Sequence, residues 1–160
     1  MSRAQVAAAR SLRSSGVRVR KEIQVSLPRE EAFGYVADFA NSAEWDPGIA
    51  AGMKITDGPV RKGSEFEIVA VFRGKRQPFH YVITEFEPAR RVALMGEGEK
   101  ARSVDEIAFE PAEGGTRIIY VAVIRLKGIA RVAEPLLAST MNRMADDALA
   151  GLKYVLDRPR

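Results

Sequence analysis

Three side chains in strand-like segments of the 160-residue sequence could serve as a catalytic acid or base: His80 in "QPFHYVITEFE", Asp105 in "RSVDEIAFE" and Tyr120 in "TRIIYVAVIRLKG". General acid–base catalysis needs two titratable groups held at the reacting atoms, so two of these would suffice. A Ser/His/Asp triad would have to combine His80 with Ser103 and Asp105, but no nucleophile-elbow sequence surrounds Ser103. His80, Asp105 and Tyr120 are therefore the catalytic candidates.

The composition excludes several other chemistries. His80 is the only histidine and there is no cysteine, which excludes disulfides, cysteine nucleophiles and zinc sites built on two or three histidines. We expect neither a metal nor a cofactor. No apolar run reaches the roughly 20 residues that a transmembrane helix needs. A cysteine-free chain fits a reducing cytoplasm, which is the expected location.

The basic charge of the chain is concentrated at its start. The net charge is +4, yet the first 21 residues hold six basic side chains and no acid, which leaves 19 basic against 21 acidic residues in the rest. We predict a basic, flexible or loosely helical extension over residues 1–16 and one domain over residues 17–160. The near-neutral domain does not indicate a nucleic-acid-binding protein.

Hydrophobic spacing predicts the elements that must position the candidates. Residues 17–25 alternate as a strand, and residues 28–38 carry a helical stripe, followed by a second short helical turn up to Trp45. Residues 50–126 change to a period of two cut by short turns, which predicts an antiparallel meander. From Pro135 the spacing is helical again. We predict an α+β fold with one strand, two short helices, about six strands and a long C-terminal helix.

This order resembles the START-like superfamily, and within it the polyketide cyclase/dehydrase and lipid-transport (SRPBCC) group. The resemblance rests on "LPREEAFGYVADFANSAEWDP", "ITEFEPARRVALMGEG", "IAFEPAEGGTRIIYVAVIRLKG" and the amphipathic C-terminal helix, and it spans about residues 17–157. It implies a helix-grip fold, in which a curved antiparallel sheet of six to seven strands wraps around the C-terminal helix. It also implies a hydrophobic cavity between sheet and helix. No catalytic signature accompanies it.

The resemblance further implies a register for the strand around Asp105. With Phe109 inward, Asp105 and Ile107 face the cavity as well, whereas a shift by one residue would turn Glu106 inward instead. Alternation places Tyr120 inward too, beside Asp105. A carboxylate in such a place needs hydrogen-bond partners, has a raised pKa, or binds a ligand hydroxyl. Structural pairing is the preferred interpretation of Asp105.

The residues expected to bind a ligand are polar, aromatic and methionine side chains assigned to the cavity, together with one isoleucine. They are Trp45, Phe66, Tyr81, Met95, Asp105, Ile107, Tyr120, Met141 and Met144. For Trp45, the only tryptophan, we predict a position at the cavity mouth, because its segment is a break between elements. The alternative is a fixed ring that plugs one end of the fold. Alternation does not decide whether His80 or Tyr81 faces inward.

Three functions are compatible with these features. The preferred one is binding or transport of a hydrophobic small molecule such as a lipid, isoprenoid or polyketide, because an apolar cavity is expected and catalytic groups are few. The second is a cyclase or dehydratase that uses the Asp105 and Tyr120 pair, or His80, as acid and base. The third is interaction with a macromolecule through the basic extension, which the near-neutral domain disfavours.

Overall fold

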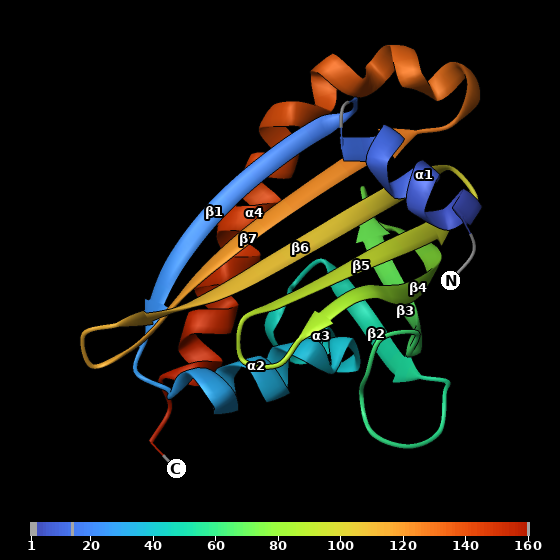
Figure 1. Ribbon diagram of the computed structural model, residues 1–160. Coiled ribbons are helices and arrows are strands. Elements are labelled where there is room, and N and C mark those ends of the chain that lie inside the picture. The colour runs from blue at the N-terminus through green and yellow to red at the C-terminus, as the bar shows by residue number, and fades with distance from the viewer. Residues whose placement is uncertain (1–2, 14, 160) are drawn as a thin grey trace.

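The computed structural model describes residues 3–13 and 15–159 and confirms the helix-grip arrangement (Figure 1). The elements, in chain order, are α1 (Arg3–Arg13), β1 (Val17–Val25), α2 (Arg29–Ala37), the 3₁₀ helix η1 (Phe39–Asn41), α3 (Ser42–Trp45), β2 (Ile49–Lys54), β3 (Glu65–Phe72), β4 (Lys75–Glu87), β5 (Arg91–Gly98), β6 (Ala101–Ala112), β7 (Gly115–Leu126), the 3₁₀ helix η2 (Gly128–Ala133) and α4 (Glu134–Leu156). Within these residues seven antiparallel strands form one sheet in the order β1-β7-β6-β5-β4-β3-β2. The predicted meander is confirmed.

Local sequence explains the hairpins of this sheet. Between β3 and β4, Arg73 and Gly74 both have positive φ angles of 50° and 74°, which is the backbone that a two-residue turn between twisted strands requires. Between β6 and β7, Gly114 has a φ of 74°. Short turns of this kind leave no room for a crossover, and from β2 to β7 each strand pairs with the next one along the chain, while β1 pairs with β7.

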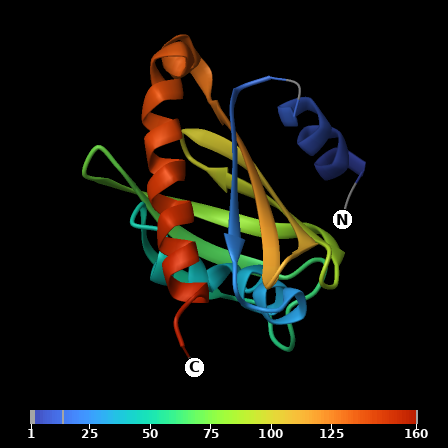
Figure 2. The same ribbon diagram turned by 90° about the vertical axis from the view of Figure 1, so that its left-hand side faces the viewer.

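Helix α4 covers the inner face of the sheet. It runs beside β1, and α2 and α3 close one end of the fold (Figures 1 and 2). Pro135 lies in the first turn of α4, as predicted, where its missing amide proton leaves no hydrogen bond unmade. At the closed end the Phe33 ring packs edge-on against Phe86 and Phe109, with centroids 5.2 and 5.3 Å away. A sealed apolar core therefore fills this end of the space between sheet and helices.

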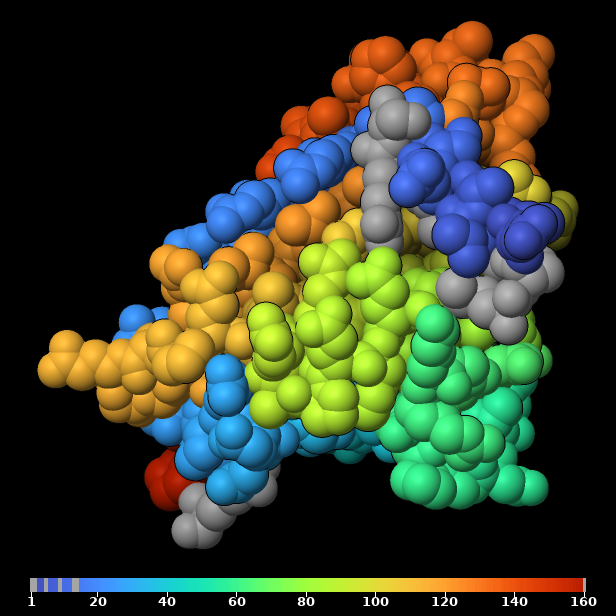
Figure 3. Space-filling model, viewed as in Figure 1, coloured from blue at the N-terminus to red at the C-terminus, as the bar shows by residue number. Residues whose placement is uncertain are grey.

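The basic extension forms helix α1, which lies on the side of the sheet opposite α4 (Figures 2 and 3). Its Leu12 is buried and packs with Val104 and Met95, whereas Val6 is half exposed. The side chain of Ser15, just after the helix, is hydrogen-bonded by Arg125. α1 thus contacts the outer face mainly near its C-terminal end.

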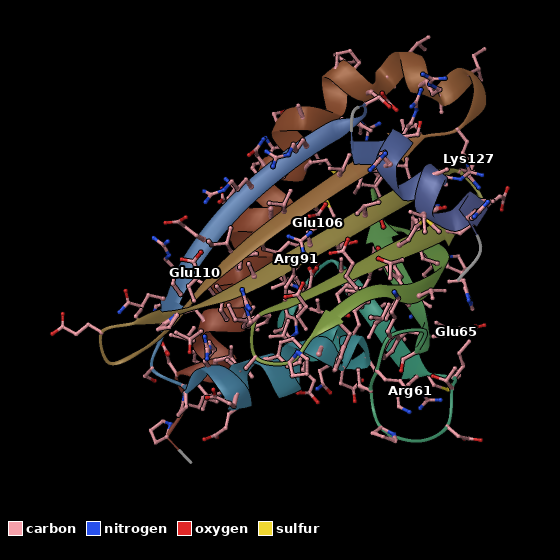
Figure 4. All side chains as sticks on the ribbon, viewed as in Figure 1. Arg61, Glu65, Arg91, Glu106, Glu110 and Lys127 are labelled. Atoms are coloured by element: carbon pink, nitrogen blue, oxygen red, sulfur yellow. The ribbon has the colours of Figure 1, made fainter. Side chains whose placement is uncertain are left out.

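The outer face of the sheet carries charged side chains in cross-strand pairs. Arg91 on β5 pairs with Glu85 at 2.9 Å and also with Glu106 on β6, as Figure 4 shows for Arg91 and Glu106. His80 Nε2 lies 3.0 Å from Glu65. Because Glu106 is on this face, the alternative register with Glu106 inward is not the one adopted. None of the helices in the described part of the chain is long and apolar enough to span a membrane.

Candidate functional site

A cavity of about 150 Å³ lies between the inner face of the sheet and α4. The sheet contributes residues of every strand except β5, and the helices contribute residues of η1, α3 and the middle of α4. Six of the residues expected to bind a ligand line it: Trp45, Tyr81, Asp105, Tyr120, Met141 and Met144. The register that the resemblance implies for Asp105 and the alternation argument for Tyr120 both agree with the structure, because the two side chains line the cavity.

A chain of hydroxyl groups surrounds the carboxylate of Asp105. The Tyr120 hydroxyl donates a 2.7 Å hydrogen bond to Asp105 Oδ1, and the Ser103 hydroxyl donates one of 3.2 Å to Oδ2. Because the Ser103 hydroxyl donates its hydrogen bond to Asp105, its oxygen accepts one from the Tyr81 hydroxyl, which lies 2.7 Å away. Structural pairing of Asp105, the preferred interpretation, is present, and it joins side chains from β4, β6 and β7.

Gly96 makes this chain of contacts possible. It lies on β5 in register with Tyr81 on β4 and Ser103 on β6. A Cβ atom at position 96 would be 2.5 Å from Tyr81 Cζ and 2.7 Å from Ser103 Oγ, closer than real Cβ contacts allow. The missing side chain lets the Tyr81 ring lie across β5 and reach Ser103. The sequence signal is the glycine at position 96 in "RVALMGEG".

A second carboxylate, Asp46, lines the same cavity. It follows Trp45 at the end of α3, and its Oδ1 accepts a 2.7 Å hydrogen bond from the backbone N–H of Gly48. Sequence analysis did not identify it. The signal was its place in "EWDPG", where an aspartate before Pro-Gly also fits an ordinary turn. The cavity therefore contains two acids, three hydroxyl groups and Lys21 within a lining that is otherwise mostly apolar.

Burial has the largest effect on the pKa values of these groups. It raises the pKa of Asp105 from 3.8 to about 6, against the hydrogen bonds from Tyr120, Ser103 and Tyr81 that favour the ionised form. Burial likewise raises the pKa of Asp46 to about 6, with smaller contributions from the charges of Asp105 and Asp147. The pKa values of Tyr81 and Tyr120 lie well above 10, first because of burial and then because of the Asp105 charge. Both phenols are therefore neutral donors at physiological pH.

Trp45 forms part of the cavity wall, but it is not at an exposed mouth. Its ring is 4% exposed and meets Tyr120 edge-on with centroids 6.4 Å apart. Gly151 on α4 packs directly on its backbone, because a Cβ there would be 2.0 Å from the Trp45 carbonyl oxygen. The predicted mouth position is wrong, and the alternative of a fixed ring closing one end describes the structure. The predicted short helical turn is helix α3, whose Ser42 and Trp45 are buried while Ala43 and Glu44 are exposed.

A second compartment of about 340 Å³ continues from the first. The two share Ala70, Phe79, Ile124, Met141 and Met144. The outer compartment is lined mostly by apolar side chains and by exposed residues of the β3–β4 and β5–β6 turns, so it reaches the surface there. Met141 and Met144 line both compartments at their junction, and their flexible side chains can change conformation there.

Four predicted site residues lie elsewhere. Phe66 and Ile107 are fully buried in the core and do not belong to the cavity lining. Met95 is on the outer face against Val104 and Leu12, because β5 places it opposite its neighbours Leu94 and Gly96. His80 points outward to Glu65. The assignments of Met95 and His80 to the site are therefore corrected. Of the neighbours His80 and Tyr81, it is Tyr81 that faces the cavity.

The comparisons with known proteins agree with this geometry. A family model described as polyketide cyclase / dehydrase and lipid transport matches residues 16–157. No curated protein sequence matches the chain. At 14% identity, the structure of a START superfamily protein from Mycobacterium smegmatis superposes with a TM-score of 0.75, covering 88% of this chain and 97% of that one.

Two further solved structures share the fold. A protein from Thermus thermophilus has a TM-score of 0.74 at 19% identity, covering 87% of this chain and 96% of that one. The Zhui aromatase/cyclase of a Streptomyces species has a TM-score of 0.74 at 12% identity, covering 88% of this chain and 93% of that one. At such identities the likeness shows the fold alone.

Proposed function

The chain belongs to the polyketide cyclase/dehydrase and lipid-transport family of the START-like superfamily, and on that premise we propose that it binds a hydrophobic small molecule whose polar end donates hydrogen bonds. The apolar body of the ligand would occupy the outer compartment, and its polar end would reach Asp105 and Asp46. The cysteine-free sequence supports a cytoplasmic location as part of the same proposal.

The observation that carries the proposal is the charge of the inner compartment. Asp46 and Asp105 both line it, and Lys21 is the one cation among the described lining residues. Lys21 is engaged with Asp146 on α4 at 2.8 Å. A ligand carboxylate would therefore be repelled by two acids. A hydroxyl or an ammonium group would instead donate hydrogen bonds to them. A fatty alcohol, phenol or amine fits this site better than a fatty acid.

A matched series tests the proposal. Decanol, decylamine and decanoate have the same chain length and differ in the polar end. We expect decanol and decylamine to bind at pH 7.5 and decanoate to bind at least about ten-fold more weakly, as measured by calorimetry and by Trp45 emission. Equal binding of all three would refute the selection by the two acids. Binding of none would count against the ligand-binding function itself.

A second candidate function is acid–base catalysis of a cyclisation or dehydration. The observation in its favour is that two carboxyl groups with pKa values of about 6 share one cavity, since such values suit proton transfer near neutral pH. Asp105→Asn keeps the shape of the side chain and removes the acid. Loss of turnover of an aromatic polyketide mimic in this variant, with folding and ligand binding intact, would favour the enzyme over the carrier.

A further inference from the structure

We propose that η2 and the first turn of α4 form a docking surface for an anionic lipid membrane. Three large apolar side chains of this segment point into solvent: Ile129 is 90% exposed, Val132 81% and Leu136 76%. We call these three residues the apolar patch. Isolated exposed apolar residues are common on protein surfaces, but three within eight consecutive positions are a concentrated feature.

The spacing of the apolar patch aligns its members along one side of the segment. Ile129 and Val132 are three apart in the 3₁₀ helix η2, and Leu136 follows four residues later in α4, so the three project on the same side. Leu137, the next residue, is buried and lines the outer compartment. The segment therefore has one apolar side toward the cavity and another toward the surroundings. Figure 1 shows it overhanging one end of the sheet.

The charges at this end of the molecule indicate which partner fits. Arg73, Lys75 and Lys100 line the outer compartment, and Glu99 is the one acid among its described lining residues. Arg131 belongs to η2 itself and is exposed. Apolar side chains that insert below the headgroups, with cations that hold anionic headgroups, form the combination by which proteins attach to membrane surfaces. Neither feature alone gives stable attachment.

The position of the patch adds a reason for a lipid surface rather than a protein partner. The outer compartment, which opens at the β3–β4 and β5–β6 turns, is also lined by Ala130 of η2 and Leu137 of α4, so the apolar patch lies beside it. A hydrophobic molecule could therefore pass between the membrane and the cavity with little exposure to water. The inference concerns the surface and does not depend on which molecule the cavity binds.

Sedimentation of the full chain with sucrose-loaded vesicles tests the docking surface. The vesicles contain phosphatidylcholine alone or phosphatidylcholine with roughly 30% phosphatidylglycerol. We expect binding to the anionic vesicles, weak binding to the neutral ones, and about a ten-fold loss of anionic binding in Ile129→Ser/Val132→Ser/Leu136→Ser. The basic extension is present in every protein, so its contribution is constant across the comparison.

A matched control removes exposed apolar side chains elsewhere. Met53 and Tyr154 are 57% and 67% exposed, and Met53→Ser/Tyr154→Ser should bind vesicles like the wild type. Unchanged melting temperatures confirm that all variants are folded. The proposal is overturned if the triple variant binds anionic vesicles as well as the wild type does. It is also overturned if the wild type binds no vesicles and instead forms a dimer that the triple substitution abolishes.

Discussion

The phenol of Tyr120 and the carboxylate of Asp105 face one cavity and share a 2.7 Å hydrogen bond. The Asp105 charge is stabilised by neutral hydroxyl groups. Its described hydrogen-bond partners include no cation. Hydroxyl donors compensate only part of the loss of solvation, which is why the pKa of Asp105 is raised to about 6 despite the hydrogen bonds from Tyr120 and Ser103. The ionised form of Asp105 is therefore destabilised in the folded protein.

This destabilisation of the ionised form predicts how the effect of Asp105→Asn on stability depends on pH. The folded protein holds the Asp105 proton up to about pH 6, whereas the unfolded chain releases it near 3.8. The free energy of unfolding of the wild type therefore falls as pH rises through this window, and Asp105→Asn lacks that fall. Relative to the wild type, the variant should gain about 2–3 kcal/mol between pH 4 and pH 7.

Urea unfolding of both proteins at several pH values measures the difference. Asp57→Asn is the control for the same substitution at an exposed position. A constant difference between Asp105→Asn and the wild type from pH 4 to pH 7 would show that Asp105 is ionised at no cost in the folded state.

Gly96→Ala should break the contact between Tyr81 and Ser103. The added Cβ would stand 2.5 Å from the Tyr81 ring, so the ring must move off β5, with an expected loss of about 1–3 kcal/mol of unfolding free energy. Gly34→Ala in α2 is the matched control, since no atom lies within 4 Å of its Cβ and alanine favours a helix by up to about 1 kcal/mol. If both variants lost the same stability, the close approach at Gly96 would not matter.

Ligand binding should change the emission of Trp45, the only tryptophan. Its ring lines the inner compartment, so a ligand that reaches Tyr120 alters its surroundings. We expect a saturable shift or quenching on titration with decanol, absent in Trp45→Phe, with calorimetry showing that this variant still binds. Binding by calorimetry without any change in wild-type emission would place the ligand in the outer compartment alone.

Deletion of residues 1–16 should have little effect on the domain. Leu12 is the one large apolar side chain of α1 that is buried among those described. Its burial is worth about 1.5–3 kcal/mol, and ordering the helix offsets most of this gain. We expect the unfolding free energy to fall by less than about 1 kcal/mol. Leu12→Ala in the full chain reports the contact separately, and a large loss in either variant would show that the extension is integral to the fold.

The fold could be predicted from the sequence because its signals are local. Period-two alternation with short turns requires neighbouring antiparallel strands, and the stripe containing Leu152 requires a helix packed on them. The same alternation predicts Tyr120 on the inner face, whereas the inward position of Asp105 follows from the register that the family resemblance implies. These features depend on positions only a few residues apart.

The errors concern contacts that join distant segments. Met95 was assigned by residue type, yet the register of β5 turns it outward toward Leu12. Trp45 was placed at the surface because it interrupts two elements, but the close packing of Gly151 on α4 buries it. Asp46 was missed because an Asp-Pro-Gly turn has an ordinary local explanation. None of these pairings has a signature within one segment.

The pairing of β1 with β7 imposes an order on folding during synthesis. Val17 pairs with Ile124, and Val25 with Thr116, so β1, the first strand of this sheet to be synthesised, pairs with β7, the last one. The hairpins from β2 to β7 can form one after another as the chain emerges, at roughly 5–20 residues per second. Over those seconds β1 has no strand partner. Chaperones that hold extended apolar segments would therefore meet this chain at its N-terminal strand, and substitutions that slow the closing step would reduce its yield before they reduce its stability.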